Sequence, residues 1–391
     1  LWTGDLHMRK IGILTYFWAD NPGTFLQAYS TYRAISQLFP EDRVELINYK
    51  HRYVFYKPSL GHILTGKFME GYKRHVQFQG LIHDNLPLSR HRITSRDRLS
   101  ASDYIRRQNY DLIVVGSDTV LQMLPFHFKK NEVPIYWLPA NIPCRKVVCA
   151  ASSSALSIRD LTESQIIECR NSMEHYDFIG VRDDATYSLL SSLGIRNMSS
   201  LEIIPDPTFS MDIDYSHIEN LFGKTGFEPD EKSVVIDLPR RFTAAHQIAD
   251  HFRARGYRII SLVPADYADY CFINVSPFEW AGIYRYCELV ITQRFHGTIY
   301  SLKNFVPVMT VVWTDELKSR EGLSKHRSLL KSFGMDEFSY IDGGSLKDPR
   351  HVFTNSEKVM AEFDRDTVIK NLERHRNAYL EFIHKIPPLI S

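Results

Sequence analysis

The chain of 391 residues is 44% apolar and 24% charged, which is ordinary for a globular protein and long enough for about two domains. Its 47 Lys and Arg residues almost balance 46 Asp and Glu residues. The resulting net charge of +1 argues against a nucleic-acid-binding protein, whose binding domain is usually strongly basic. Five cysteines without a CxxC spacing exclude a disulfide framework and do not suggest a zinc site. We therefore expect reduced thiols, a cytoplasmic location, and no bound metal or nucleic acid.

The sequence contains no apolar run of the ~18–20 residues needed to span a bilayer. Its opening, Leu1–Met8, lacks the basic and apolar regions of a signal peptide, and we interpret residues 1–8 as a cloning remnant with Met8 as the native start. Membrane contact is then expected to be peripheral at most, at the inner face, through the basic stretches Lys67–Arg74 and Arg90–Arg98. A solvated helix or loop face is the alternative for both stretches.

Short apolar runs along the chain predict buried strands, at residues 11–16, 44–48, 112–115, 147–151, 178–181, 202–204, 234–237, 259–263, 289–292 and 308–312. Continuous Val, Ile and Leu runs of this length are typical of strands covered on both faces, as in parallel sheets. Helical patterns alternate with them, at Leu26–Leu38, Thr186–Leu193 and Ala244–Arg255. The last two are followed directly by glycine, the usual residue after a helix C-terminus.

This alternation predicts an α/β fold of two Rossmann-like domains whose parallel sheets face a cleft. The first domain is expected over residues 9–210, with a polar and basic helical insertion at 51–110. Acidic, glycine and proline residues cluster at 206–230, so we expect the second domain over 211–365. Residues 366–391 have an amphipathic helix pattern and are expected to return to the first domain. In such folds, ligands usually bind at the carboxyl ends of the strands.

Two strand ends in the first domain carry polar residues. The run 11–16 leads into Asp20 and Asn21, before a helix predicted to start near Thr24. The free backbone N–H groups at the start of this helix would suit an anion. The alternative is that the segment is only a tight turn between the strand and the helix. The run 112–115 ends in Gly-Ser-Asp, which places Ser117 and Asp118 at the carboxyl edge. Asp118 is expected to bind a sugar hydroxyl or act as a base, or else to cap the following turn.

Two further strand ends carry arginine. Arg182 follows the run 178–181, and its guanidinium can donate two parallel hydrogen bonds to a carboxylate or phosphate group. The alternative is a salt bridge to Asp183, Asp184 or Asp206. Arg294 and His296 follow the run 289–292, flanking a helix predicted to begin near Gly297-Thr298. A cation, an imidazole and free backbone donors there would suit a phosphate-bearing substrate that needs proton transfer.

Taken in order, these segments resemble the polysaccharide pyruvyl transferase family over residues 10–335. The matching segments are IGILTYFWADNPGTFLQAYS, YDLIVVGSDTV, FIGVRDDATYSLLSSLGI, IIPDPTF, VITQRFHGTIYSLKNFVPV and HRSLLKSFGM. The resemblance implies a fold of the glycosyltransferase-B type. It also implies transfer of the carboxyvinyl unit of phosphoenolpyruvate onto two sugar hydroxyls, closing a cyclic ketal and releasing phosphate. Phosphoenolpyruvate is then the donor substrate, no cofactor is expected, and the acceptor is a saccharide or lipid-linked saccharide.

The resemblance also implies roles for the strand-end residues. Arg182 and Arg294 would bind the carboxylate and phosphate of the donor. The second domain is expected to be the donor side and the first domain the acceptor side. His296 would be the acid/base residue or a phosphate ligand, and Asp118 or Asp20 the second acid/base group. The other residues expected to bind substrate are Phe295, Gly297, Thr298, Asn21, Asp20 and Ser117.

Two other functions remain open from the sequence. A nucleotide-sugar glycosyltransferase on the same fold would need an acidic residue for the ribose, with Glu279 or Glu316 as the available choices. A non-catalytic sugar- or anion-binding relative would retain ligand affinity without His296.

Overall fold

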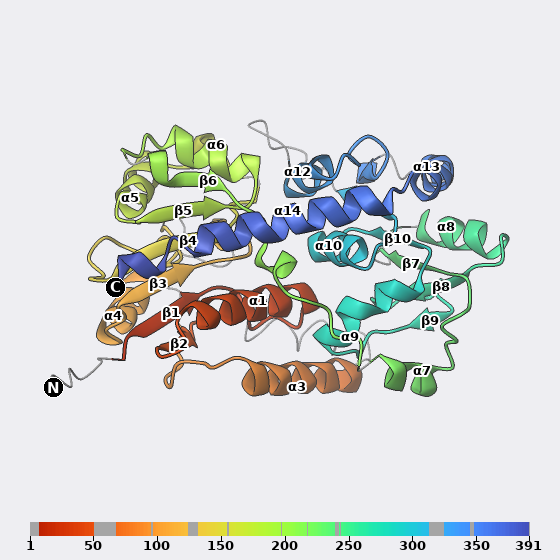
Figure 1. The fold of residues 1–391 in the computed structure, drawn as a ribbon, viewed down its shortest axis with the longest axis horizontal. Helices are drawn as coiled ribbons and strands as arrows, with labels where there is room; N and C mark the ends of the chain where they lie inside the picture. Colours follow the sequence, from red (N-terminus) through yellow and green to blue (C-terminus); the bar gives the residue numbers. More distant parts are fainter. Residues whose placement is uncertain are drawn as a thin grey trace. The chain divides into compact units, whose positions relative to one another are not determined.

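The computed structural model (Figure 1) describes residues 8–50, 68–94, 97–123, 132–154, 156–196, 198–216, 218–238, 242, 244–312, 324–344 and 348–390. The predicted remnant 1–8, apart from Met8, lies outside the described residues, as do Glu316 and parts of the two basic stretches and of the predicted insertion. The chain divides into two compact units. Unit 1 comprises Leu1–Asp20, Gln27–Ser210 and Asn377–Ser391, and unit 2 comprises Asn21–Leu26 and Met211–Arg376.

Unit 1 contains a sheet of parallel strands in the order β2-β1-β3-β4-β5-β6. Its strands are β1 (Lys10–Leu14), β2 (Arg43–Leu46), β3 (Leu112–Val115), β4 (Arg145–Ala151), β5 (Phe178–Val181) and β6 (Leu201–Ile203). Its helices are α1 (Pro22–Leu38), which begins in residues grouped with unit 2, α3 (Phe68–Asn85), α4 (Arg98–Arg107), α5 (Glu163–Met173) and α6 (Asp184–Ser192). Strand β3 is a fully buried apolar run, and β4 is buried and apolar from Val147 onward, which explains why they form the core of the unit.

Unit 2 contains a second parallel sheet, in the order β12-β11-β10-β7-β8-β9. Its strands are β7 (Ser233–Asp237), β8 (Arg258–Ser261), β9 (Tyr270–Cys271), β10 (Leu289–Thr292), β11 (Val308–Val312) and β12 (Tyr340–Asp342). Its helices are α7 (Glu219–Thr225), α8 (Ala244–Arg253), α9 (Pro277–Gly282), α10 (Phe295–Lys303), α12 (Lys325–Ser332) and α13 (Arg350–Ala361). Helix α14 (Arg365–Ile383) begins in unit 2, and its residues from Asn377 onward group with unit 1.

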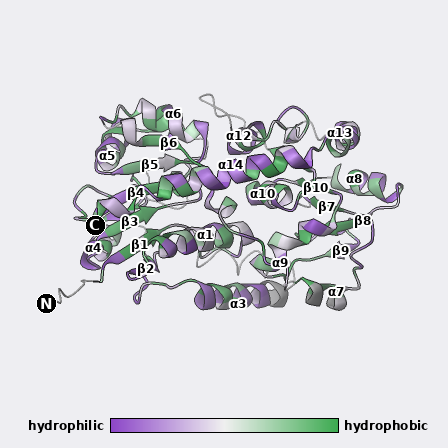
Figure 2. Ribbon diagram, in the orientation of Figure 1, coloured by the Kyte–Doolittle hydropathy of each residue, from purple (hydrophilic) through white to green (hydrophobic). Residues whose placement is uncertain are grey.

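The predicted α/β fold with parallel sheets is confirmed, and each predicted strand is present with ends that shift by at most a few residues. Figure 2 shows hydrophobic residues along the central strands and hydrophilic residues on helices such as α14. The edge strands β9 and β12 were not predicted, because each is only two or three residues long and carries polar residues. None of the described helices is both long and apolar enough to cross a membrane.

The parallel strands of each sheet bring their carboxyl ends to one edge. In unit 1, Asp20, Ser117, Asp118 and Arg182 lie in the segments that follow β1, β3 and β5. In unit 2, Asp237 ends β7, and Arg294 and His296 follow β10. The predicted site residues therefore form two groups, each at the carboxyl edge of its own sheet.

Candidate functional site

Helix α10 begins at Phe295, two residues earlier than predicted. Arg294 has extended backbone dihedrals and is the N-cap residue, and the backbone N–H of Thr298 donates to the carbonyl of Arg294 at 3.0 Å. The N-cap residue makes no side-chain capping hydrogen bond to this helix. His296 consequently lies within the first turn, where the positive end of the helix dipole favours an anion.

The start of α10 is shaped by small residues. A Cβ atom at Gly297 would lie 2.7 Å from Oγ1 of Thr292, so a larger residue would push the helix off the end of β10. Thr298 is buried, and its hydroxyl lies 2.8 Å from that of Thr310 on β11. Both residues therefore fix the helix start, and their direct contact with a ligand stays a prediction.

The loop before α1 packs against His296. Asn21 is the N-cap of α1: its side chain accepts a hydrogen bond from the N–H of Gly23 at 3.0 Å, and its carbonyl accepts one from Phe25. The helix therefore begins at Pro22, two residues before the predicted start near Thr24. A Cβ atom at Gly23 would lie 2.4 Å from Nδ1 of His296, so the loop backbone rests directly on the imidazole. His296 is thus flanked by the first turns of two helices, both within unit 2.

Arg294 is bound to a carboxylate that the sequence analysis did not select. Its Nε lies 2.9 Å from Oδ2 of Asp237, which is fully buried at the end of β7. The side chain of Arg294 is 25% exposed. Asp237 could have been found from the sequence, because it is the last residue of a predicted strand, and parallel strands end at the same edge. The signal was missed because a single Asp at a strand end is common.

Phe295 is buried beside His296, with ring centroids 5.5 Å apart, and its ring also lies 5.6 Å from that of His326 of α12. This contact joins two segments that carry the family resemblance, VITQRFHGTIYSLKNFVPV and HRSLLKSFGM. The aromatic ring therefore packs α12 against the start of α10, and a contact with substrate stays a prediction.

In unit 1, Ser117 and Asp118 are used by the fold itself. Ser117 is fully buried and donates to the side-chain carbonyl of Gln27 at 2.5 Å. Asp118 accepts a hydrogen bond from the N–H of Thr119 at 2.7 Å, which is the turn-capping alternative, and lies 3.8 Å from Arg182. Their predicted roles in binding and catalysis are not tested by these contacts.

Arg182 forms the salt bridge that the sequence left open as an alternative. Its Nη1 donates to Oδ2 of Asp206 at 2.7 Å, and the two side chains are 2% and 0% exposed. Burial disfavours the charged guanidinium, but Asp206, followed by Asp118 and Asp183, outweighs it and raises the pKa of Arg182. Asp206 is itself held by the N–H and hydroxyl of Thr208. Binding of the donor by Arg182 stays a prediction.

Asp20 pairs with a histidine that the sequence analysis missed. Both of its carboxylate oxygens lie 3.0 Å from Nδ1 of His75 on α3, and Arg74 donates to its backbone carbonyl at 3.1 Å. The two contacts anchor α3 to the loop after β1. His75 was missed because it lies in the predicted insertion, where no strand end or motif marked it.

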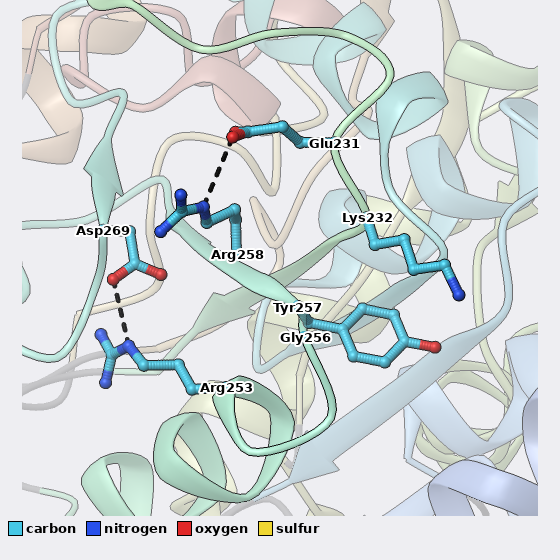
Figure 3. A pocket seen from close by; sticks show the side chains of 7 residues that line it. All are labelled: Glu231, Lys232, Arg253, Gly256, Tyr257, Arg258 and Asp269. Carbon is cyan, nitrogen blue, oxygen red and sulfur yellow. Dashed lines mark hydrogen bonds and ion pairs between the residues drawn. The ribbon is translucent and has the colours of Figure 1, made fainter.

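A charged pocket of about 500 Å³ lies elsewhere on unit 2 (Figure 3), lined by Glu231, Lys232, Arg253, Gly256, Tyr257, Arg258 and Asp269. Two of its cations are paired, Arg253 with Asp269 at 3.0 Å and Arg258 with Glu231 at 3.4 Å. Its residues lie at or near the amino-terminal ends of β7, β8 and β9. The pocket is therefore at the opposite edge of the sheet from Arg294 and His296, and it is not the predicted site. Among the described residues, no group of three metal-ligating side chains is present.

Several solved structures share this fold. UDP-GlcNAc 2-epimerase from Methanocaldococcus jannaschii has a TM-score of 0.58 and 10% identity, covering 97% of this chain and 99% of the other. S. aureus MnaA, solved with UDP, has a TM-score of 0.54 and 10% identity, covering 97% and 98%. UGT73P12 from Glycyrrhiza uralensis, solved with glycyrrhetinic acid 3-O-monoglucuronide, has a TM-score of 0.51 and 10% identity, covering 98% and 96%. At these identities, the likeness shows the fold alone.

These likenesses define the class of protein: two parallel-sheet α/β domains of the glycosyltransferase-B type, as predicted. Residues 21–316 match the sequence model of the polysaccharide pyruvyl transferase family, and the chain belongs to that family. The matched range contains both arginines and His296, and membership implies a transferase. Among individual curated proteins, none matches the sequence.

Proposed function

We propose that the protein transfers the carboxyvinyl group of phosphoenolpyruvate onto two hydroxyls of a saccharide or lipid-linked saccharide, forming a cyclic ketal and releasing phosphate. The observation that carries this proposal is the surroundings of His296: the first turns of α10 and α1 flank its imidazole, and Arg294 is the N-cap residue of α10. Family membership supports the same reaction class.

The donor chemistry matches these groups. Phosphoenolpyruvate carries about three negative charges, and a guanidinium beside a helix N-terminus is a suitable partner for its phosphate and carboxylate. In the first step, the electron pair of the carbon–carbon double bond takes a proton at the methylene carbon, and a sugar hydroxyl oxygen bonds to the central carbon and gives up its own proton to a base, so no net proton is consumed. In the second, another hydroxyl oxygen bonds to that carbon, the carbon–oxygen bond to phosphate breaks, and the second hydroxyl proton leaves with the phosphate.

We assign proton transfer to His296, because histidine exchanges protons readily near neutral pH. Positive charge from Arg294 stabilises the phosphate as it leaves. We place donor binding on unit 2 and acceptor binding on unit 1, with Asp118 or Asp20 as the base for the acceptor hydroxyl. Asp20 is partnered by His75, whose Nδ1 lies 3.0 Å from its carboxylate.

The test is thermal unfolding of the intact chain with phosphoenolpyruvate, compared with UDP-, GDP- and CMP-sugars over a range of concentrations. A ligand at 100 times its dissociation constant adds about 2.7 kcal/mol to stability. We expect a dose-dependent shift with phosphoenolpyruvate that is lost in the Arg294→Met variant. The Arg253→Met variant is the matched control, because Arg253 is also paired with an aspartate but at the other edge of the sheet.

A shift with a nucleotide sugar and none with phosphoenolpyruvate would replace this proposal with the glycosyltransferase alternative. Of the two acidic residues considered for ribose binding in that alternative, Glu279 is used to cap helix α9. The carboxylate of Glu279 accepts a hydrogen bond from the backbone N–H of Ser276 at 2.7 Å. A ligand shift that persists in a His296→Ala variant, with no turnover in the wild type, would favour a non-catalytic binding protein.

A further inference from the structure

We propose that Asp237 is a positioning residue for the donor, because it holds the guanidinium of Arg294 and the start of helix α10 in place before the ligand binds. This inference rests on the proposed function, since it assigns Arg294 to donor binding. Asp237 is fully buried, and its Oδ2 forms an ion pair with Nε of Arg294 at 2.9 Å, a contact that is electrostatic because Nε has no hydrogen-bond partner among the described residues. A buried carboxylate is costly unless it is paired, so the contact with Arg294 also holds Asp237 in place.

Asp237 reaches Arg294 by a second route through Thr292. Asp237 and Thr292 face each other in the register of β7 and β10, and the Thr292 hydroxyl donates to Oδ2 at 3.3 Å. The same Oγ1 accepts a hydrogen bond from the backbone N–H of Arg294 at 3.0 Å. One carboxylate therefore fixes both the side chain and the backbone of residue 294. Because Gly297 rests on Thr292, the first turn of α10 is fixed as well.

The arrangement leaves part of Arg294 for a ligand. Its side chain is 25% exposed, and within the described ranges Asp237 is its only acidic partner. The contact uses Nε, at the inner end of the guanidinium, whereas Arg binds phosphate or carboxylate through two parallel N–H groups. A tethered guanidinium also loses less conformational freedom on binding than a mobile one. Asp237 thereby holds the guanidinium of Arg294 in a fixed orientation at the carboxyl edge of the sheet.

Replacing Asp237 with asparagine is a clean perturbation. Oδ1 of Asp237 has no hydrogen-bond partner among the described residues, so an amide of the same shape breaks no contact there. The substitution removes the negative charge next to Arg294, which by itself would strengthen anion binding. It also releases the guanidinium, which weakens binding. If Asp237 acts by positioning Arg294, the affinity lost by releasing the guanidinium exceeds the affinity gained by removing the negative charge.

The experiment is a double-mutant cycle on the intact chain, with phosphoenolpyruvate affinity measured by calorimetric titration. We expect Asp237→Asn to lower the affinity about tenfold, equivalent to about 1.4 kcal/mol. In an Arg294→Met background, we expect Asp237→Asn to have no further effect, because the residue acts through Arg294. The matched control is Asp269→Asn, which removes an aspartate 3.0 Å from Nε of Arg253 at the other edge of the sheet. It should leave the affinity unchanged.

If Asp237→Asn fails to fold, Thr292→Val tests the second route with the carboxylate intact, and we expect it to lower affinity severalfold. An unchanged or higher affinity in the folded variants, or equal losses with and without Arg294, would overturn the inference. Failure of the wild-type protein to bind phosphoenolpyruvate would instead refute the proposed function. The cycle is then repeated with inorganic phosphate as the probe, and absence of phosphate binding by the wild type refutes the inference too.

Discussion

Replacing Arg182 with methionine removes the cation from a buried ion pair and leaves Asp206 uncompensated. The pair is short, 2.7 Å between Nη1 and Oδ2, and water has almost no access, because the side chains are 2% and 0% exposed. Methionine retains much of the apolar stem of arginine. The substitution therefore tests the charge rather than the packing.

The structure sets the expected size of the effect. Breaking a fully buried pair by removing one partner costs about 3–5 kcal/mol. In a domain of about 150–250 residues, each kcal/mol shifts the melting temperature by about 2–4 °C. We therefore expect the transition of unit 1 to fall by about 6–20 °C. A double variant, Arg182→Met with Asp206→Asn, should recover part of this loss, because the uncompensated charge is gone.

The assay is thermal unfolding followed by calorimetry. Arg145→Met is the matched control: Arg145 pairs with Asp177 at 2.8 Å, but its side chain is 52% exposed, so solvent screens the pair. Its loss should cost about 1 kcal/mol or less. A cost below about 1 kcal/mol for Arg182→Met would refute the argument from burial. Phosphoenolpyruvate titration of the same variant, kept below its melting temperature, tests whether Arg182 also binds the donor.

Three further predictions concern His296, Gly23 and His375. His296→Ala should lower phosphoenolpyruvate-dependent phosphate release by about 10²–10⁴-fold. The control is His246→Ala, at an exposed position on α8, which should leave the rate unchanged. A loss below threefold in His296→Ala would contradict proton transfer by His296. Gly23→Ala should displace the imidazole, since its Cβ would lie 2.4 Å from Nδ1 of His296, and so weaken phosphoenolpyruvate-induced stabilisation. Gly223→Ala, which meets nothing within 4 Å, is the control. Burial lowers the pKa of His375, despite its bond to the carbonyl of Asn371, with Arg374 lowering it further. Below about pH 6.5 the unfolded chain then binds more protons than the folded chain, so the free energy of unfolding should fall as the pH drops below that value. The fall should be smaller in the His375→Gln variant. Urea unfolding midpoints at pH 7.5 and 5.5 measure the difference.

The strands were predictable because their chemistry is local. β3 and β10 are uninterrupted apolar runs that only a sheet covered on both faces accommodates, and their predicted bounds agree with the structure. β9 and β12 lack that signal, because short strands at a sheet edge are held by backbone hydrogen bonds to a neighbour rather than by their own side chains. The other two edge strands, β2 and β6, lie in runs with buried apolar residues and were predicted, so a place at the edge does not by itself hide a strand.

The start of α10 shows a second limit. The glycine at 297 suggested that the helix begins there, since glycine often marks a turn. The structure shows that Gly297 is already helical and is small because Thr292 occupies the place of its side chain. A close approach and a turn select the same residue type. Only the packing of β10 against α10 distinguishes them.

The pairing of charged residues explains why the two arginines, so similar in sequence, differ in the structure. Arg182 follows β5 and pairs with Asp206 after β6, whereas Arg294 follows β10 and pairs with Asp237 at the end of β7. In each case this partner comes from the neighbouring strand of the sheet, and Arg182 also lies 3.8 Å from Asp118. The two arginines differ in burial: the side chain of Arg182 is 2% exposed beside Asp206, whereas the side chain of Arg294 is 25% exposed, so part of it faces solvent. An aspartate behind an arginine is thus compatible with anion binding, provided that it fixes the guanidinium without enclosing it.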